Sequence, residues 1–229
     1  MPHPLTIPQY VLDRIKAKRG RLTVFDRFDP KKTALLVIDM QNFFVAEVDT
    51  AKSIVPNINR LARVMRERGG LVVWVVMTLA EKLDAPSLWP IYHDYFFTDA
   101  KMRAHKDGLT AGTEGHKLYP ELDVRAEDPI CHKSRFSAFI QGASDLDAQL
   151  RKRGIENLVV CGTATNMCCE TTARDAMMIG YRAAIVHDAS AARFDEDHLA
   201  GLTSFWQSFG DVRGADDVID NLLRPGTRD

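Results

Sequence analysis

Short, nearly continuous apolar runs alternate along the chain with longer segments in which apolar residues recur every three or four positions. The runs have the length and composition of strands that are buried on both faces. They occupy residues 33–39, 71–78, 130–133, 158–161 and 181–187, and Val212 begins a further short strand. The periodic segments are typical of helices with one apolar face. They occupy residues 53–68, 146–153, 167–178, 198–209 and 215–223. This alternation predicts an α/β fold with one doubly wound, mostly parallel sheet and helices on both faces.

The chain divides into an N-terminal arm, residues 1–30, and a single α/β domain, residues 31–229. The arm begins with a proline-rich stretch and continues as a short basic helix that Gly20 ends. We expect it to pack on the domain surface or on a neighbouring subunit. Residues 79–121 form a long, aromatic and irregular segment, which predicts substrate contacts or a subunit interface.

Composition narrows the classes of partner. The net charge is -1 and the pI is about 6.7, which gives no indication of a nucleic-acid or membrane-surface partner. No apolar run reaches the roughly 18 residues of a membrane span. No strand is followed by G-x-G-x-x-G, so a dinucleotide cofactor is not expected. The four cysteines do not resemble a disulfide framework, which predicts a reducing, cytoplasmic location. They are Cys131, Cys161, Cys168 and Cys169.

Three residues with chemical potential follow predicted strands. Asp39, Lys133 and Cys168 all stand at carboxyl ends, where open α/β sheets place their ligands. Cys168 also begins a helix, whose N-terminus favours a thiolate over a thiol. Cys169 points roughly 100° away around that helix, into the packing against the sheet. We therefore expect one cleft to hold the first three residues.

These three residue types fit cysteine-based acyl transfer. A cysteine must lose its proton before it attacks, and a carboxylate can take that proton and pass it to a leaving nitrogen. A lysine beside both would stabilise their charged forms. The alternative is that Asp39 caps a turn and that both adjacent cysteines are core residues. None of the seven histidines stands at a comparable strand end, so a papain-like Cys-His pair has no support.

Three motifs in residues 25–223 resemble those of the isochorismatase-like cysteine hydrolases. They are ALLVIDMQN with Asp39, HKSRFSAF with Lys133 and GTATNMCCETTARDA with Cys168, and AGTEGHKLYPEL is a further similar segment. The resemblance implies a Cys-Asp-Lys triad, a cis peptide between Thr163 and Ala164, and an oxyanion hole made by the amides of Ala164 and Cys168.

The resemblance is closest to the N-carbamoylsarcosine and ureidoacrylate amidohydrolases. It implies hydrolysis of a small amide, carbamoyl or ureido compound through a thioester. The alternatives are a nicotinamidase, an isochorismatase-type hydrolase or a catalytically silent binding member. Isochorismatases work without the cysteine, and the Asp-x-His metal motif of nicotinamidases is missing from MTLAEKLDAPSLWP. We therefore expect no metal and no other cofactor, a small-molecule substrate, no nucleic-acid or membrane partner, and a homo-oligomer (dimer or tetramer).

Four further residues are predicted to contact the substrate. Arg135 follows Lys133 by two positions, so on an extended segment it points to the same side. Its guanidinium could hold a carboxylate with two hydrogen bonds, which would make the substrate a small acid. A surface arginine paired with a nearby acid is the alternative. Gln41, Asn42 and Phe136 flank the triad in sequence and are the other candidates.

Overall fold

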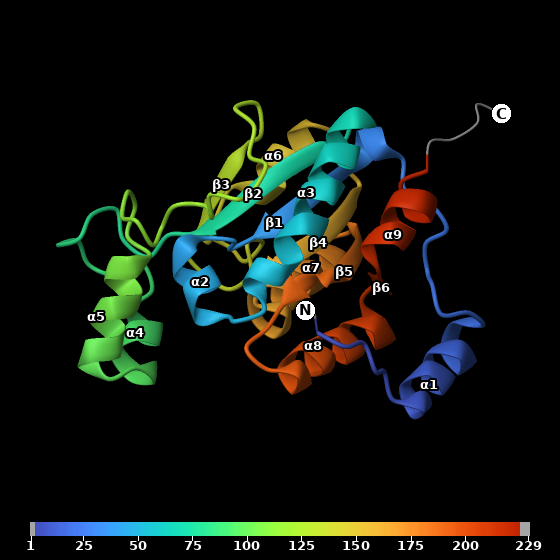
Figure 1. The fold of residues 1–229 in the computed structure, drawn as a ribbon, viewed down its shortest axis with the longest axis horizontal. Coiled ribbons are helices and arrows are strands. Elements are labelled where there is room, and N and C mark those ends of the chain that lie inside the picture. Colours follow the sequence, from blue (N-terminus) through green and yellow to red (C-terminus); the bar gives the residue numbers. More distant parts are fainter. Residues whose placement is uncertain (1–2, 225–229) are drawn as a thin grey trace.

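The fold is built on one six-stranded sheet (Figure 1). In the computed structural model, which describes residues 3–224, the strand order is β3-β2-β1-β4-β5-β6 and all neighbours are parallel. The strands are β1 (Thr33–Ile38), β2 (Leu71–Met77), β3 (Ile130–Lys133), β4 (Asn157–Thr163), β5 (Arg182–Ala191) and β6 (Asp211–Arg213). The chain winds outward from β1 to β3, returns to the centre at β4 and winds to the other edge, which confirms the predicted doubly wound α/β fold.

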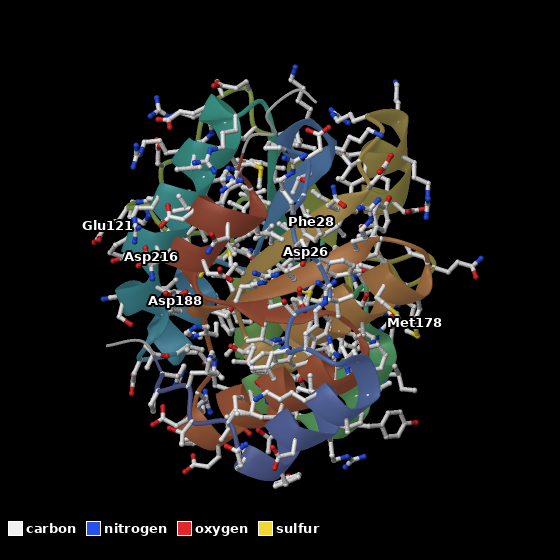
Figure 2. The ribbon with its side chains drawn as sticks, turned by 90° about the vertical axis from the view of Figure 1, so that its right-hand side faces the viewer. Asp26, Phe28, Glu121, Met178, Asp188 and Asp216 are labelled. Carbon is white, nitrogen blue, oxygen red and sulfur yellow. The ribbon has the colours of Figure 1, made fainter. Side chains whose placement is uncertain are left out.

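Helices cover both faces of the sheet. One face packs against α3 (Ala51–Glu67), α9 (Ala215–Asp217) and the π-helical turn Val218–Leu222. The opposite face packs against α1 (Gln9–Arg19), α6 (Leu146–Lys152), α7 (Glu170–Met178) and α8 (Asp195–Ser208). In Figure 2, Asp216 of α9 and Met178 of α7 lie on opposite sides of the molecule. Within residues 3–224, no helix has the length and apolar character needed to cross a membrane.

The segment predicted to be irregular contains two helices. They are α4 (Pro90–Phe96) and α5 (Asp99–Gly108), and both project beyond the sheet in Figure 1. Pro90 is at the first helical turn, where its fixed φ and missing N–H are tolerated. Both helices are short and rich in aromatic or charged residues, so they lack a clear apolar period. For the same reason, no apolar period predicted α2 (Asn42–Glu47).

The N-terminal arm is part of the packed domain. Val11 and Ile15 of α1 are almost completely buried in the core cluster that contains α7 and α8. Gly20 ends α1 with φ 75, as the sequence predicted. Residues 1–2 of the predicted arm and residues 225–229 of the predicted domain lie outside the described residues.

One glycine allows the two central strands to approach closely. Gly162 of β4 is paired with Ile38 of β1 and has φ 115. A Cβ atom at this position would lie 2.1 Å from the backbone oxygen of Ile38. Both the conformation and the contact exclude a larger residue. The close approach matters because the segments after β1 and β4 carry Asp39 and Cys168.

We expect Gly162→Ala to lower the free energy of unfolding by about 3 kcal/mol or more, because backbone strain and a backbone clash act together. Gly180→Ala is the matched control, since Gly180 has φ 104 but nothing within 4 Å of the added Cβ. Chemical denaturation of both variants measures the difference. Equal losses in the two variants would show that the contact with Ile38 is unimportant.

Candidate active site

Asp39, Lys133 and Cys168 meet at the carboxyl end of the sheet. Asp39 directly follows β1 with φ 50, Lys133 is the last residue of β3, and Cys168 lies in a π-helical turn, Thr165–Cys169, after β4. Because β2 separates β3 from β1, the Lys133 side chain reaches across β2, and its Nζ lies 2.7 Å from Asp39 Oδ2. Both of these side chains are completely buried, and Cys168 is 4% exposed.

The remaining contacts fix the lysine and leave one carboxylate oxygen available. Lys133 Nζ also donates to the carbonyl oxygen of Arg135 at 3.0 Å and approaches Met77 Sδ at 3.9 Å. Asp39 Oδ1 is buried and has no hydrogen-bond partner among residues 3–224. A buried carboxylate oxygen without a donor is costly, so it is a strong candidate to accept a proton.

The electrostatics of the site favour a neutral thiol beside a strong base. Burial raises the pKa of Asp39, and the nearby Lys133 only partly opposes this. Burial works against the charge on Lys133, but Asp39 and Cys168 outweigh it and raise the pKa of the lysine. Burial, together with Asp39, raises the pKa of the Cys168 thiol. A helix N-terminus favours a thiolate, but at Cys168 burial has the larger effect and shifts the pKa of the thiol upward.

The turn that carries Cys168 presents two backbone amides. The peptide bond between Thr163 and Ala164 is cis, and the amide of Cys169 donates to the carbonyl of Ala164 at 3.2 Å, which closes the π-helical turn. Thr163 Oγ1 donates to the carbonyl of Asp39 at 2.9 Å and ties the turn to the acid. In the described part of the chain, the amides of Ala164 and Cys168 have no acceptor outside the turn. They remain available for the predicted role as an oxyanion hole.

Two histidines that were not among the predicted site residues, His3 and His198, connect the N-terminal arm to this turn. His198 Nδ1 lies 2.8 Å from Thr165 Oγ1, and its ring stacks on His3 at 4.5 Å. His3 Nδ1 lies 2.5 Å from Asp195 Oδ1. No motif surrounds either histidine, so only their contacts reveal the connection between the N-terminal arm and the turn.

Cys168 opens onto a cavity of about 340 Å³. Its floor includes Thr163, Ala164 and Cys168, and its walls are mainly aromatic. The aromatic lining residues are Phe43, Phe44, Trp89, Tyr92, Phe97, His105 and Phe136. Phe136 is thus placed where the sequence predicted substrate contact. Glu47, Arg193 and Asp197 are the charged lining residues, and Glu47 pairs with Arg193 at 2.9 Å.

Gln41, Asn42 and Arg135, which were predicted to contact the substrate, do not line this cavity. Gln41 is completely buried, and its amide bonds to the backbone N–H and C=O of Met77, so it joins the end of β1 to β2. Asn42 donates to the carbonyl and the carboxylate of Glu114. These two residues therefore support loops, and the prediction of substrate contact is corrected for both.

Arg135 faces a different space from the one we predicted. Its Nη1 donates to the carbonyls of Leu88 and Ser134, and its guanidinium lies 5.3 Å from the centroid of the Trp89 ring. It lines a second cavity of about 400 Å³ that shares Trp89 and Phe136 with the first. The segment after β3 turns, so spacing along an extended strand does not apply. The prediction that Arg135 holds a substrate carboxylate beside Cys168 is therefore corrected.

A family model and two related proteins match most of this chain. The isochorismatase domain model matches residues 33–217. An uncharacterized isochorismatase family protein of Bacillus subtilis is 32% identical over 194 residues, which cover 85% of this chain and 96% of that protein. A protein of Arabidopsis thaliana named probable inactive nicotinamidase is 36% identical over 186 residues, which cover 75% of this chain and 87% of that protein.

Solved structures show the same similarity. The cysteine hydrolase from Pseudomonas syringae pv. phaseolicola superposes with a TM-score of 0.74 at 26% identity, covering 86% of this chain and 96% of that one. The N-carbamoylsarcosine amidase from Thermoplasma acidophilum has a TM-score of 0.64 at 26% identity, covering 81% and 97%.

The buried histidine behind the turn predicts acid sensitivity of the fold. Burial, with smaller contributions from His3 and His187, lowers the pKa of His198 to about 3 from the ordinary value of 6.5. The unfolded chain therefore binds a proton near pH 6.5 that the folded protein cannot bind, so stability falls as the pH decreases from 6.5 towards 3. We expect His198→Asn, which can keep a hydrogen bond to Thr165, to reduce the loss of unfolding free energy between pH 7 and pH 4.5 by about 2 kcal/mol. Urea denaturation at both pH values measures this loss, and an unchanged loss would contradict the assignment.

Proposed function

The chain belongs to the isochorismatase family of hydrolases, and from this membership we propose that it is a cysteine-dependent amidohydrolase. In this proposal it cleaves a C–N bond in a small non-peptide amide, carbamoyl or ureido compound. The observation that carries the proposal is the buried Lys133–Asp39 pair beside Cys168 at the floor of an aromatic cavity. The similarity to a cysteine hydrolase and to an N-carbamoylsarcosine amidase supports the same reaction class.

The first half of the reaction forms a thioester. Cys168 Sγ attacks the carbonyl carbon of the substrate while its proton passes to Asp39, whose raised pKa makes it a stronger base than an ordinary aspartate. The amides of Ala164 and Cys168 donate to the oxygen on which negative charge develops. Lys133 remains charged beside the developing thiolate. Asp39 then gives the proton to the leaving nitrogen as the C–N bond breaks, and ammonia or an amine departs.

The second half hydrolyses the thioester. Water attacks the same carbonyl carbon and gives a proton to Asp39, while the same two amides hold the oxyanion. The C–S bond breaks and the thiolate of Cys168 takes the proton back from Asp39. The product is a carboxylic acid, or a carbamic acid when the substrate is a ureido or carbamoyl compound.

The resemblance to a probable inactive nicotinamidase supports a second candidate, a catalytically silent member of the family. The intact arrangement of acid, lysine and cysteine around an open cavity favours an active protein. The expected cytoplasmic location and homo-oligomeric state stay predictions, as does the expectation of metal-independent activity.

We expect the protein to release ammonia from at least one compound in a panel of small amides and ureas, with Cys168 as the nucleophile. Cys168→Ser should abolish turnover with little change in thermal stability. Cys169→Ser is the matched control. Cys169 is completely buried, and this burial raises the pKa of its thiol, so the variant should keep most of the activity. Loss of turnover in Cys169→Ser alone would assign the nucleophile to the other cysteine. A parent protein that releases no ammonia would favour the silent candidate.

The proton-transfer role of Asp39 predicts opposite effects on two measurements. Asp39→Asn should lower turnover by roughly 10² or more, because no base remains. The same change should accelerate alkylation of Cys168 by iodoacetamide, because the Asp39 charge raises the pKa of the thiol and Lys133 lowers it. Lys133→Met should slow both reactions. Slower alkylation in Asp39→Asn would contradict the expectation that the charge of Asp39 raises the pKa of the thiol.

A further inference from the structure

A chain of hydrogen bonds leads through α4 and α5 to the catalytic cavity. The amide of Trp89 donates to Ser87 Oγ at 2.9 Å, and this oxygen lies 2.5 Å from His93 Nδ1. His93 Nε2 lies 3.0 Å from His105 Nδ1. The mechanism uses none of these residues, yet the His105 ring lines the cavity that contains Cys168.

Each ring nitrogen of these histidines can donate or accept, and one arrangement uses every polar hydrogen of the chain. Ser87 Oγ accepts from Trp89, and its own hydrogen has no acceptor among residues 3–224 other than His93 Nδ1. In this arrangement His93 carries its proton on Nε2 and donates it to His105 Nδ1, so His105 carries its proton on Nε2. Burial lowers the pKa of His93, and it lowers that of His105 to about 4, so both rings are neutral near pH 7 and one proton lies between them.

The Nε2–H group of His105 is left for a ligand. The hydrogen bonds among residues 3–224 include none to His105 Nε2, and the His105 ring lines the cavity. The ring cannot easily turn away, because it stacks on Phe97 at 5.0 Å and meets the edge of Phe43 at 5.5 Å. A fixed donor in an otherwise aromatic wall gives a pocket orientation and specificity.

The charge around the cavity disfavours an anionic ligand. Glu47 and Asp197 contribute two carboxylates and Arg193 contributes one guanidinium, which is already paired with Glu47. The aromatic walls accommodate a flat apolar body. Trp89 stacks on Tyr92 at 4.5 Å, and Tyr92 meets the edge of Phe136 at 5.3 Å.

We propose that His105 is a substrate-binding residue whose Nε2–H donates to a polar group on the body of an uncharged, flat amide or ureido substrate, while Cys168 attacks its carbonyl carbon. The proposal rests on the proposed amidohydrolase function and adds the class of substrate. Ser87 and His93 act as positioning residues, because they fix the tautomer and orientation of His105 without lining the cavity.

Four probes test this assignment: benzamide, 3-hydroxybenzamide, 3-carboxybenzamide and acetamide. Protection of Cys168 against iodoacetamide measures binding, and ammonia release measures turnover. We expect 3-hydroxybenzamide to protect at about tenfold lower concentration than benzamide, the size of one hydrogen bond. 3-Carboxybenzamide and acetamide should both protect less well than benzamide.

The variants locate the hydrogen bond. His105→Phe keeps an aromatic ring against Phe97 but loses the donor, so the preference for 3-hydroxybenzamide over benzamide should fall from about tenfold to within twofold. His105→Gln, which restores an N–H group, should recover part of the preference. Tyr92→Phe is the matched control, since it removes the neighbouring hydroxyl of the wall and should keep the preference.

Several results would overturn the assignment. They are a preference that survives in His105→Phe, a preference that disappears in Tyr92→Phe, better protection by 3-carboxybenzamide or acetamide than by benzamide, and no protection by any probe. Protection with the expected pattern but without ammonia release from any compound would reject the amidohydrolase function and retain the binding site.

Discussion

The buried ion pair between Lys133 and Asp39 is the interaction on which the site depends. Removing two charges from water is costly, and the cost is offset only when the geometry is good and the remaining hydrogen-bonding groups are satisfied. Lys133 meets this condition with Asp39 and the carbonyl of Arg135, whereas Asp39 keeps one oxygen without a donor. The ion pair is therefore stabilised through Lys133, while the free oxygen of Asp39 can accept a proton. Burial also raises the pKa of the neighbouring Cys168 thiol.

The sheet explains why residues so far apart in the chain form this pair. β1 and β4 are neighbours at the point where the winding direction changes, so the segments that follow them diverge and leave room for a ligand. Gly162 lets these strands approach closely, and Thr163 connects the turn after β4 to the backbone of Asp39. Asp39, Lys133 and Cys168 lie at or just after the carboxyl ends of strands, while the aromatic wall comes from α2, from α4 and the residues that flank it, from α5 and from the segment after β3.

Much of this arrangement could be predicted from the sequence, because strand ends in a parallel sheet converge wherever the strands are recognisable. The apolar runs located the strands, and the motifs indicated three residues, Asp39, Lys133 and Cys168, which the fold brings together. The lining of the cavity could not be predicted in the same way. Gln41 and Asn42 are adjacent to Asp39 in sequence, but their amides bond to other backbone segments whose positions depend on tertiary packing. Arg135 follows a strand that turns, and His105 and His198 lie on helices without any motif, so only three-dimensional contacts reveal their surroundings.

The contact between the N-terminal arm and the π-helical turn Thr165–Cys169 has a consequence for how the molecule folds. His3 precedes β1 in the chain, and it contacts Asp195 and the ring of His198, which are 192 and 195 positions later. These contacts cannot form until α8 has left the ribosome, although β1, β2 and β3 can begin to fold earlier. The support behind Thr165 is therefore completed only when the two ends of the domain meet. A nascent chain therefore passes through a stage in which Asp39 and Lys133 are present but the contacts that hold Thr165 are not, so the candidate site is completed late in folding.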